Sequence, residues 1–155
     1  MTSTATTTVP LADLSALIGQ DLGPSSWLDV SQRRIDTFAD ATDDHQWIHV
    51  DPELAATGPY GGTIAHGYLS LALVIPMWTE VLDVTGVTTK LNYGLNKVRF
   101  PAPVPAGARI RLRGRLVQVE DVAGDGVQLT ADVVIEVEGG TKPACAAQIV
   151  MRFYP

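Results

Sequence analysis

The hydrophobic pattern of the chain changes once, from helical spacing in the first half to strand-like alternation in the second. Before residue 85, apolar residues recur at intervals of three and four, which is typical of helices with a buried face. From residue 88 onward, apolar and polar residues alternate in short stretches that are separated by turns rich in Gly and Pro, which is typical of antiparallel strands. We therefore predict a largely helical first half that is followed by a sheet.

One helix is expected to lie at the centre of the domain. The longest apolar run in the chain extends from His66 to about Val81, and its apolar residues cover nearly every side of a helix. A helix that is hydrophobic all round is normally buried. Pro76 lies inside this run, so we expect a kink or an early end there, because proline lacks the N–H that the helix needs.

Several shorter elements precede the central helix. Residues 11–18 favour a short helix, and residues 27–30 favour a short strand. Ser31 is suited to cap a helix over residues 31–42. Asp51-Pro52 marks a further helix start, because Asp accepts hydrogen bonds from unpaired N–H groups and Pro fits the first turn.

Five stretches after the central helix favour strands. Hairpin-type turns join the last three of them, which predicts an antiparallel sheet. A buried helix wrapped by a curved antiparallel sheet is the α+β arrangement called the hot-dog fold, and we expect one such domain over residues 11–155, after a disordered tail at residues 1–10. The predicted strands cover residues 88–93, 95–100, 109–120, 127–138 and 143–153.

Composition narrows the range of functions. The chain of 155 residues has the size of one domain. Its net charge of -6 argues against nucleic-acid binding, which depends on Lys and Arg neutralising phosphates. Cys145 is the only cysteine, so an intrachain disulfide and a thiolate zinc site are excluded, and a small buried residue is expected. We expect a cytoplasmic protein without a membrane span, because the chain shows neither a signal-peptide pattern nor an apolar stretch of about 20 residues.

Titratable residues are concentrated between residues 40 and 66, where all three histidines lie. Asp44 and His49 are five residues apart on an expected loop, so both side chains can face one cavity and hold a water molecule between them. The carboxylate would then act as general base while the imidazole orients the water. A structural alternative stays open, in which Asp44 closes the preceding helix and His49 is an ordinary loop residue.

The same region suggests two further kinds of site. His45, His49 and His66 could form a three-histidine zinc site. Against this, the helix start at Asp51-Pro52 interrupts the helix that would bring the first two histidines onto one face. The N–H of Gly67, at the start of the central helix, could stabilise a developing oxyanion, although Gly67 is equally compatible with close packing against the sheet.

Basic residues alternate along two of the predicted strands. The four arginines between residues 109 and 115 fall on one strand face, because side chains alternate with a period of two. They could bind phosphate through charge-assisted hydrogen bonds or form an ordinary solvated face. Lys97 and Arg99, beside Asn96, form a second such group to which both interpretations apply.

The titratable segment belongs to a longer motif. An aromatic residue, a Thr, an Asp, an aliphatic residue and a His follow one another in order, and a His-Gly pair comes after them. With the segment over residues 92–104, this order resembles the MaoC-like dehydratases, also called R-specific enoyl-CoA hydratases, and within them the nodulation-protein-N-like branch. The resemblance extends over about residues 27–153. The matching residues are Phe38, Thr42, Asp44, Ile48, His49, His66 and Gly67.

Three motif positions depart from the broad family. Asp43 replaces Gly, Gln46 replaces Asn and Trp47 replaces Pro. The family Asn usually orients the catalytic groups, and Gln46 could do so with a longer reach. The departures leave the same reaction type expected on a loop of altered geometry.

The resemblance implies reversible syn hydration of a trans-2-enoyl-CoA to the (R)-3-hydroxyacyl-CoA. Asp44 and His49 would be the catalytic pair and the Gly67 N–H the oxyanion donor, with no metal or redox cofactor. The resemblance also implies a homodimer whose sheets join edge to edge, with the thioester bound near the subunit boundary. Substrate-binding roles are implied for His66, Gln46, Asn96, Lys97 and Arg99.

Two alternative functions share the fold and the ligand class. A hot-dog acyl-CoA thioesterase would hydrolyse the thioester and release free CoA thiol. A non-catalytic module would bind acyl thioesters without turnover. In each case acyl carrier protein could take the place of CoA.

Overall fold

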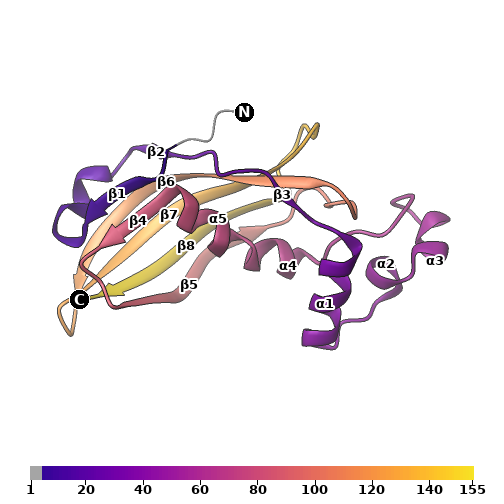
Figure 1. The fold of residues 1–155 in the computed structure, drawn as a ribbon, viewed down its shortest axis with the longest axis horizontal. Helices are drawn as coiled ribbons and strands as arrows, with labels where there is room; N and C mark the ends of the chain where they lie inside the picture. Colours follow the sequence, from indigo (N-terminus) through magenta and orange to yellow (C-terminus); the bar gives the residue numbers. More distant parts are fainter. Residues whose placement is uncertain (1–4) are drawn as a thin grey trace.

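A broad, curved antiparallel sheet forms one layer of the molecule, and helices α4 and α5 lie along its inner side (Figure 1). The computed structural model describes residues 5–155. In chain order the elements are β1 (Thr7–Pro10), the 3-10 helix η1 (Leu11–Leu17), β2 (Asp21–Leu22), β3 (Leu28–Asp29), α1 (Gln32–Thr42), α2 (Trp47–Val50), α3 (Pro52–Ala56), α4 (Gly67–Ala72), α5 (Val74–Val81), β4 (Leu82–Thr85), β5 (Thr89–Arg99), β6 (Arg109–Val122), β7 (Gly126–Val137) and β8 (Cys145–Tyr154).

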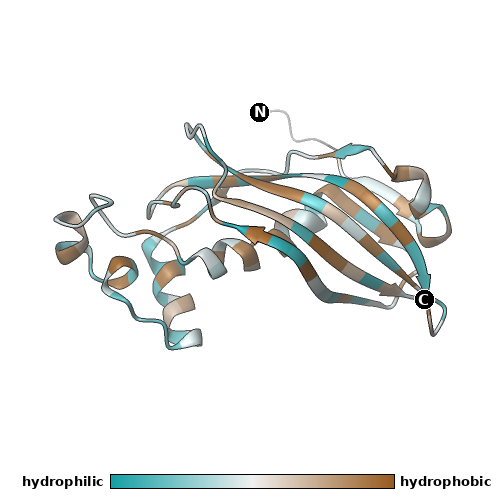
Figure 2. Ribbon diagram, turned by 180° about the vertical axis from the view of Figure 1, so that it is seen from behind, coloured by the Kyte–Doolittle hydropathy of each residue, from teal (hydrophilic) through white to brown (hydrophobic). Residues whose placement is uncertain are grey.

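The main sheet has the strand order β2-β6-β7-β8-β5, and β3 also pairs with β6. β6, β7 and β8 follow one another as antiparallel neighbours, as their alternating sequence predicts, and hydrophobic and hydrophilic residues alternate along the strands (Figure 2). The two strands that were expected on either side of Gly94 are one strand, β5. Gly94 adjoins an irregularity in the pairing of β5 with β8, so the glycine marks a bulge rather than a chain break.

The predicted central helix is interrupted, as Pro76 indicates. The break lies at Leu73, between α4 and α5. The ring of a proline clashes with the carbonyl four residues earlier, which here belongs to Ala72, so the helix is interrupted before the proline itself. Within residues 5–155, no helix has both the length and the apolar character that crossing a membrane requires.

The core lies between α5 and the inner face of the sheet. Met77 and Trp78 are buried on α5, and the inward side chains of β6 are fully buried against them. The opposite side of the helix pair is not covered, since the Tyr68 side chain is 73% exposed. The expectation that apolar residues are buried on every side of this helix is therefore wrong for the single chain. The buried inward residues of β6 are Ile110, Leu112 and Leu116.

The start of the chain is also more ordered than expected. Thr7–Pro10, which was assigned to a disordered tail, forms β1 and pairs in parallel with β4. The pairing buries Val9 beside Val84, and such burial offsets the entropy lost on ordering the segment. Residues 1–4 of the expected tail lie outside the described part of the chain.

Candidate active site

Asp44 reaches the site from the end of α1. Ser31 caps the start of this helix, because its side chain accepts a hydrogen bond from the Arg34 N–H at 3.2 Å, as predicted. The helix ends at Thr42, and Asp43 adopts a left-handed conformation with φ of 58°. This conformation favours Gly and is tolerated by Asp, which explains how Asp43 can occupy the motif position of a glycine. The resulting turn directs Asp44 toward α4.

His49 is held on α2 with one ring nitrogen committed to the backbone. The side chain is 6% exposed, and its Nδ1 lies 2.7 Å from the Ile64 carbonyl oxygen. Because a carbonyl oxygen only accepts, Nδ1 carries the proton and Nε2 keeps its lone pair. Burial lowers the pKa of His49 below its ordinary value of 6.5. His49 is therefore neutral at pH 7 and able to accept a proton at Nε2.

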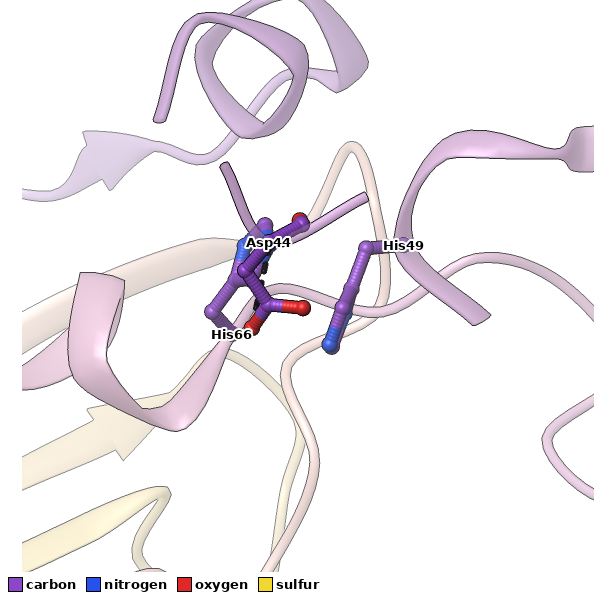
Figure 3. A group of neighbouring side chains, drawn as sticks. All are labelled: Asp44, His49 and His66. Atoms are coloured by element: carbon purple, nitrogen blue, oxygen red, sulfur yellow. Dashed lines mark hydrogen bonds and ion pairs between the residues drawn. The ribbon is translucent and has the colours of Figure 1, made fainter. Parts of the chain in front are cut away.

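His66 connects the loop that carries Asp44 to the start of the central helix. It precedes α4 as the N-cap residue, and its Nε2 donates to the Asp44 carbonyl oxygen at 2.9 Å. Its ring stacks on the ring of His49 with 3.8 Å between centroids, and Figure 3 shows Asp44, His49 and His66 side by side. One ligand-type atom from each of the three residues lies within 4.8 Å of the others. Asp44 is half exposed, so the group opens to solvent on that side.

The three residues could in principle hold a metal ion, but their geometry suits a water molecule better. The two imidazole rings are stacked and inclined by only 25°, so their lone pairs lie in nearly parallel planes. Two histidines that share a zinc ion at about 2.0–2.1 Å must instead turn their nitrogens toward one point. His45, part of the three-histidine alternative, lies elsewhere, exposed, with its Nε2 2.8 Å from Asp40. The three-histidine alternative is therefore not assembled.

Gly67 is the first residue of α4 and lies in close contact with Phe100. The first helical bond of α4 runs from the Ser70 N–H to the His66 carbonyl at 3.1 Å, so the Gly67 N–H precedes the bonded part of the helix. A Cβ atom added at Gly67 would lie 2.8 Å from Cδ2 of Phe100. Only glycine fits beneath the Phe100 ring. Both interpretations of Gly67, close packing and N–H donation, are compatible with the structure. Phe100 was not among the predicted site residues, and its contact with Gly67 has no local sequence signal.

The predicted substrate-binding residues on β5 lie apart from Asp44 and His49 within one chain. The side chain of Gln46 forms no cap bond at the start of α2. Asn96 donates to Gln148 at 2.7 Å. Lys97 and Arg99 stand opposite Gln148 and Ala146 of β8, whose side chains alternate with those that enter the core. The three β5 residues therefore lie on the outer face of the sheet, away from α4.

The arginine stripe on β6 forms a paired surface. Each of its four side chains contacts a carboxylate, and three carboxylates offset most of the positive charge that could have met a phosphate. The ion pairs join Arg109 to Glu138, Arg111 and Arg113 to Glu136, and Arg115 to Asp21.

Cys145, at the start of β8, is fully buried, and burial raises the pKa of its thiol to about 11. It is the small core residue that was expected.

The architecture is a hot-dog fold. A solved (R)-hydratase from A. caviae has the same fold, with a TM-score of 0.72 and 22% sequence identity. The comparison covers 89% of this chain and 96% of that one. The model of the MaoC like domain matches residues 13–138, and the chain belongs to this family. A 3-hydroxyacyl-thioester dehydratase Z from Mycobacterium tuberculosis is 52% identical over 92% of this chain and 95% of its own length. Nodulation protein N from Rhizobium leguminosarum bv. viciae is 44% identical over 94% and 92%. The predicted family and branch are confirmed.

Proposed function

We propose that the protein reversibly adds water to a trans-2-enoyl-CoA and forms the (R)-3-hydroxyacyl-CoA. The observation that carries the proposal is the proximity of Asp44 and His49, each of which has a ligand-type atom within 4.8 Å of the other. The Nδ1–H of His49 is bound to the Ile64 carbonyl, so the Nε2 lone pair is the one available to a water molecule. Such a pair can hold a water molecule and remove its proton. Membership of a dehydratase family, with a thioester dehydratase as a relative, supports this chemistry.

The proposed steps use only groups of the chain and the substrate. Water lies between the Asp44 carboxylate and His49 Nε2, and one of them takes its proton as the oxygen bonds to C3. The electron pair of the double bond moves toward the thioester, and the Gly67 N–H stabilises the charge on its oxygen. The proton is then returned to C2 on the same face, so the net addition is syn. Neither a metal ion nor a redox cofactor takes part.

The acyl chain has a suitable place beside the central helix. An apolar hollow of about 210 Å³ lies between α4, α5, β5 and β8. It begins at Leu71, one turn beyond Gly67, and extends to Ile75, which lies roughly 12 Å from Gly67 at a helical rise of about 1.5 Å per residue. An acyl chain whose thioester reaches Gly67 would lie there against apolar side chains. These side chains include Leu71, Ile75, Leu95, Ile149 and Met151.

The proposal extends to a homodimer that forms through β5. This strand is the edge of the described sheet, and Leu91, Tyr93 and Leu95 on it are 45%, 57% and 46% exposed. A long apolar edge strand normally has a partner or a protective feature. Sedimentation of the pure protein at micromolar concentration is expected to give twice the mass of one chain. A monomer at that concentration would contradict the assembly.

The reaction is tested by the loss of the conjugated enoyl-thioester absorbance when the protein meets short and medium trans-2-enoyl-CoA. We expect rapid loss that persists in a chelator, formation of the (R)-alcohol and no release of thiol. Release of CoA thiol would identify a thioesterase instead. Binding of the same thioesters without any change would identify a binding module. Turnover only of enoyl thioesters that are attached to acyl carrier protein would support the proposed reaction and show that the carrier is this protein and not CoA.

A further inference from the structure

The placement of His49 depends on a side chain that comes 17 residues earlier. Gln32, the first residue of α1, directs its Nε2 to the His49 carbonyl oxygen at 2.7 Å. Its other amide N–H goes to Asp36 Oδ1 at 2.8 Å. On the opposite side, Gln32 Oε1 accepts a hydrogen bond from the buried hydroxyl of Thr63. The amide of Gln32 is thus satisfied on every side, and a flipped amide would set its oxygen against the His49 carbonyl oxygen.

These hydrogen bonds belong to a closed network around His49. Thr63 adjoins Ile64, whose carbonyl oxygen holds the imidazole Nδ1–H of His49 at 2.7 Å. The Ile64 N–H in turn donates to the Ile48 carbonyl at 3.0 Å. Gln32 therefore links the backbone of His49 to the segment that orients its ring. His49 is thus held at its backbone carbonyl by Gln32 and at its imidazole Nδ1–H by Ile64, and the Gln32–Thr63 hydrogen bond connects the two points.

We propose that Gln32 and Thr63 are positioning residues that hold the His49 imidazole with Nε2 toward Asp44. This inference rests on the function proposed above, in which Nε2 must face the water. Neither residue touches the reacting atoms; both act through His49 and Ile64. A small displacement of a catalytic group is enough to slow a reaction by about 100-fold. Loss of this hydrogen-bond network should therefore reduce turnover without preventing substrate binding.

The test replaces each side chain by one of similar shape. Gln32→Met and Thr63→Val remove the hydrogen bonds, and Gln32→Glu keeps the acceptor for Thr63 while it sets a carboxylate against the His49 carbonyl. Thr63→Ser retains the hydroxyl. Arg33→Met is the matched control, since Arg33 is the exposed neighbour of Gln32 on α1. We expect kcat to fall on the order of 10- to 100-fold in the first three variants, with KM little changed. Thr63→Ser and Arg33→Met should keep full turnover.

A second readout is independent of activity. The chain has three histidines, so ¹⁵N spectra of the imidazoles can be assigned by comparison with His49→Ala. In the unaltered protein His49 should show the Nδ1–H tautomer and a pKa below 6.5, because it is buried and bound to Ile64. In Gln32→Met and Thr63→Val the tautomers should mix and the pKa should rise toward 6.5. The double variant should be no worse than either single variant, because the bonds act as one unit.

The two readouts separate the two proposals. An unchanged His49 tautomer with turnover equal to that of Arg33→Met would overturn the positioning role. Loss of the tautomer in a protein that hydrates no enoyl thioester would support the positioning role and reject the proposed reaction. If Gln32→Met does not fold, Thr63→Val applies the same test from a different segment of the chain.

Discussion

Replacement of Asp44 by Asn, or of His49 by Ala, is expected to reduce hydration of an enoyl thioester by roughly 10²- to 10⁴-fold. Asparagine keeps the shape of Asp44 and its backbone bond to His66, but an amide cannot accept the proton of water. Alanine at position 49 removes the imidazole whose Nε2 is proposed to share the proton of water. The loss should appear mainly in kcat, measured by the decay of enoyl absorbance at saturating substrate.

Two nearby substitutions serve as matched controls. Asp40 and His45 form an exposed pair with 2.8 Å between them, so Asp40→Asn and His45→Ala repeat the same chemical changes near the site but outside the dyad. Both controls should retain near-normal turnover. The double variant Asp44→Asn/His49→Ala should be little worse than either single variant, because the two residues act as one unit. Full turnover in Asp44→Asn or in His49→Ala would reject the assignment.

Replacement of Trp78 by Ala is expected to lower the free energy of unfolding by about 3–5 kcal/mol. The indole is 1% exposed on α5 and lies against β6, where a Cβ atom added at Gly114 would be 2.6 Å from Trp78 Cζ3. Alanine would leave a cavity at the contact between the helix and the sheet. Urea denaturation at fixed protein concentration measures the change, since an oligomer would otherwise make the midpoint depend on concentration.

The contact between Trp78 and Gly114 allows a second test of this prediction. Gly114→Ala should itself destabilise the protein by about 1–3 kcal/mol, because the new methyl group cannot fit beneath the indole. In a Trp78→Leu background the same substitution should cost much less. Gly62→Ala is the control, since a Cβ atom there would meet nothing within 4 Å. Equal stability changes for Gly114→Ala in both backgrounds would show that the close approach is not the cause.

Features that depend on neighbours in the sequence could be predicted well. The caps at Ser31 and Asp51 were identified because a short polar side chain bonds to N–H groups two or three residues later. The interruption of the central helix was expected because Pro76 acts on a carbonyl only four residues away. Asp44, His49 and His66 lie close together, and all three fall in one short stretch of the sequence.

Errors and omissions concern contacts between distant segments. The parallel pairing of β1 with β4 joins residues 75 positions apart, and nothing in a threonine-rich start indicates such a partner. His45 and Asn96 are bound by residues whose proximity depends on how the loop and the strands settle. Gln32 and Thr63 are 31 residues apart, and each is an unremarkable polar residue until α1 packs beside the segment around Ile64.

The sequence by itself determined the family, the order of helices followed by a sheet, and the short stretch that contains Asp44, His49 and His66. Those properties follow from periodicity, capping and turn chemistry, which act over a few residues. Only the tertiary structure decided which nitrogen of His49 is available, why residue 114 must be glycine beneath Trp78, and which side of the central helix is left uncovered. These features depend on the packing of elements that are far apart in the chain. In a close-packed interior the position of each side chain is set by its neighbours in space, which a local sequence pattern does not identify.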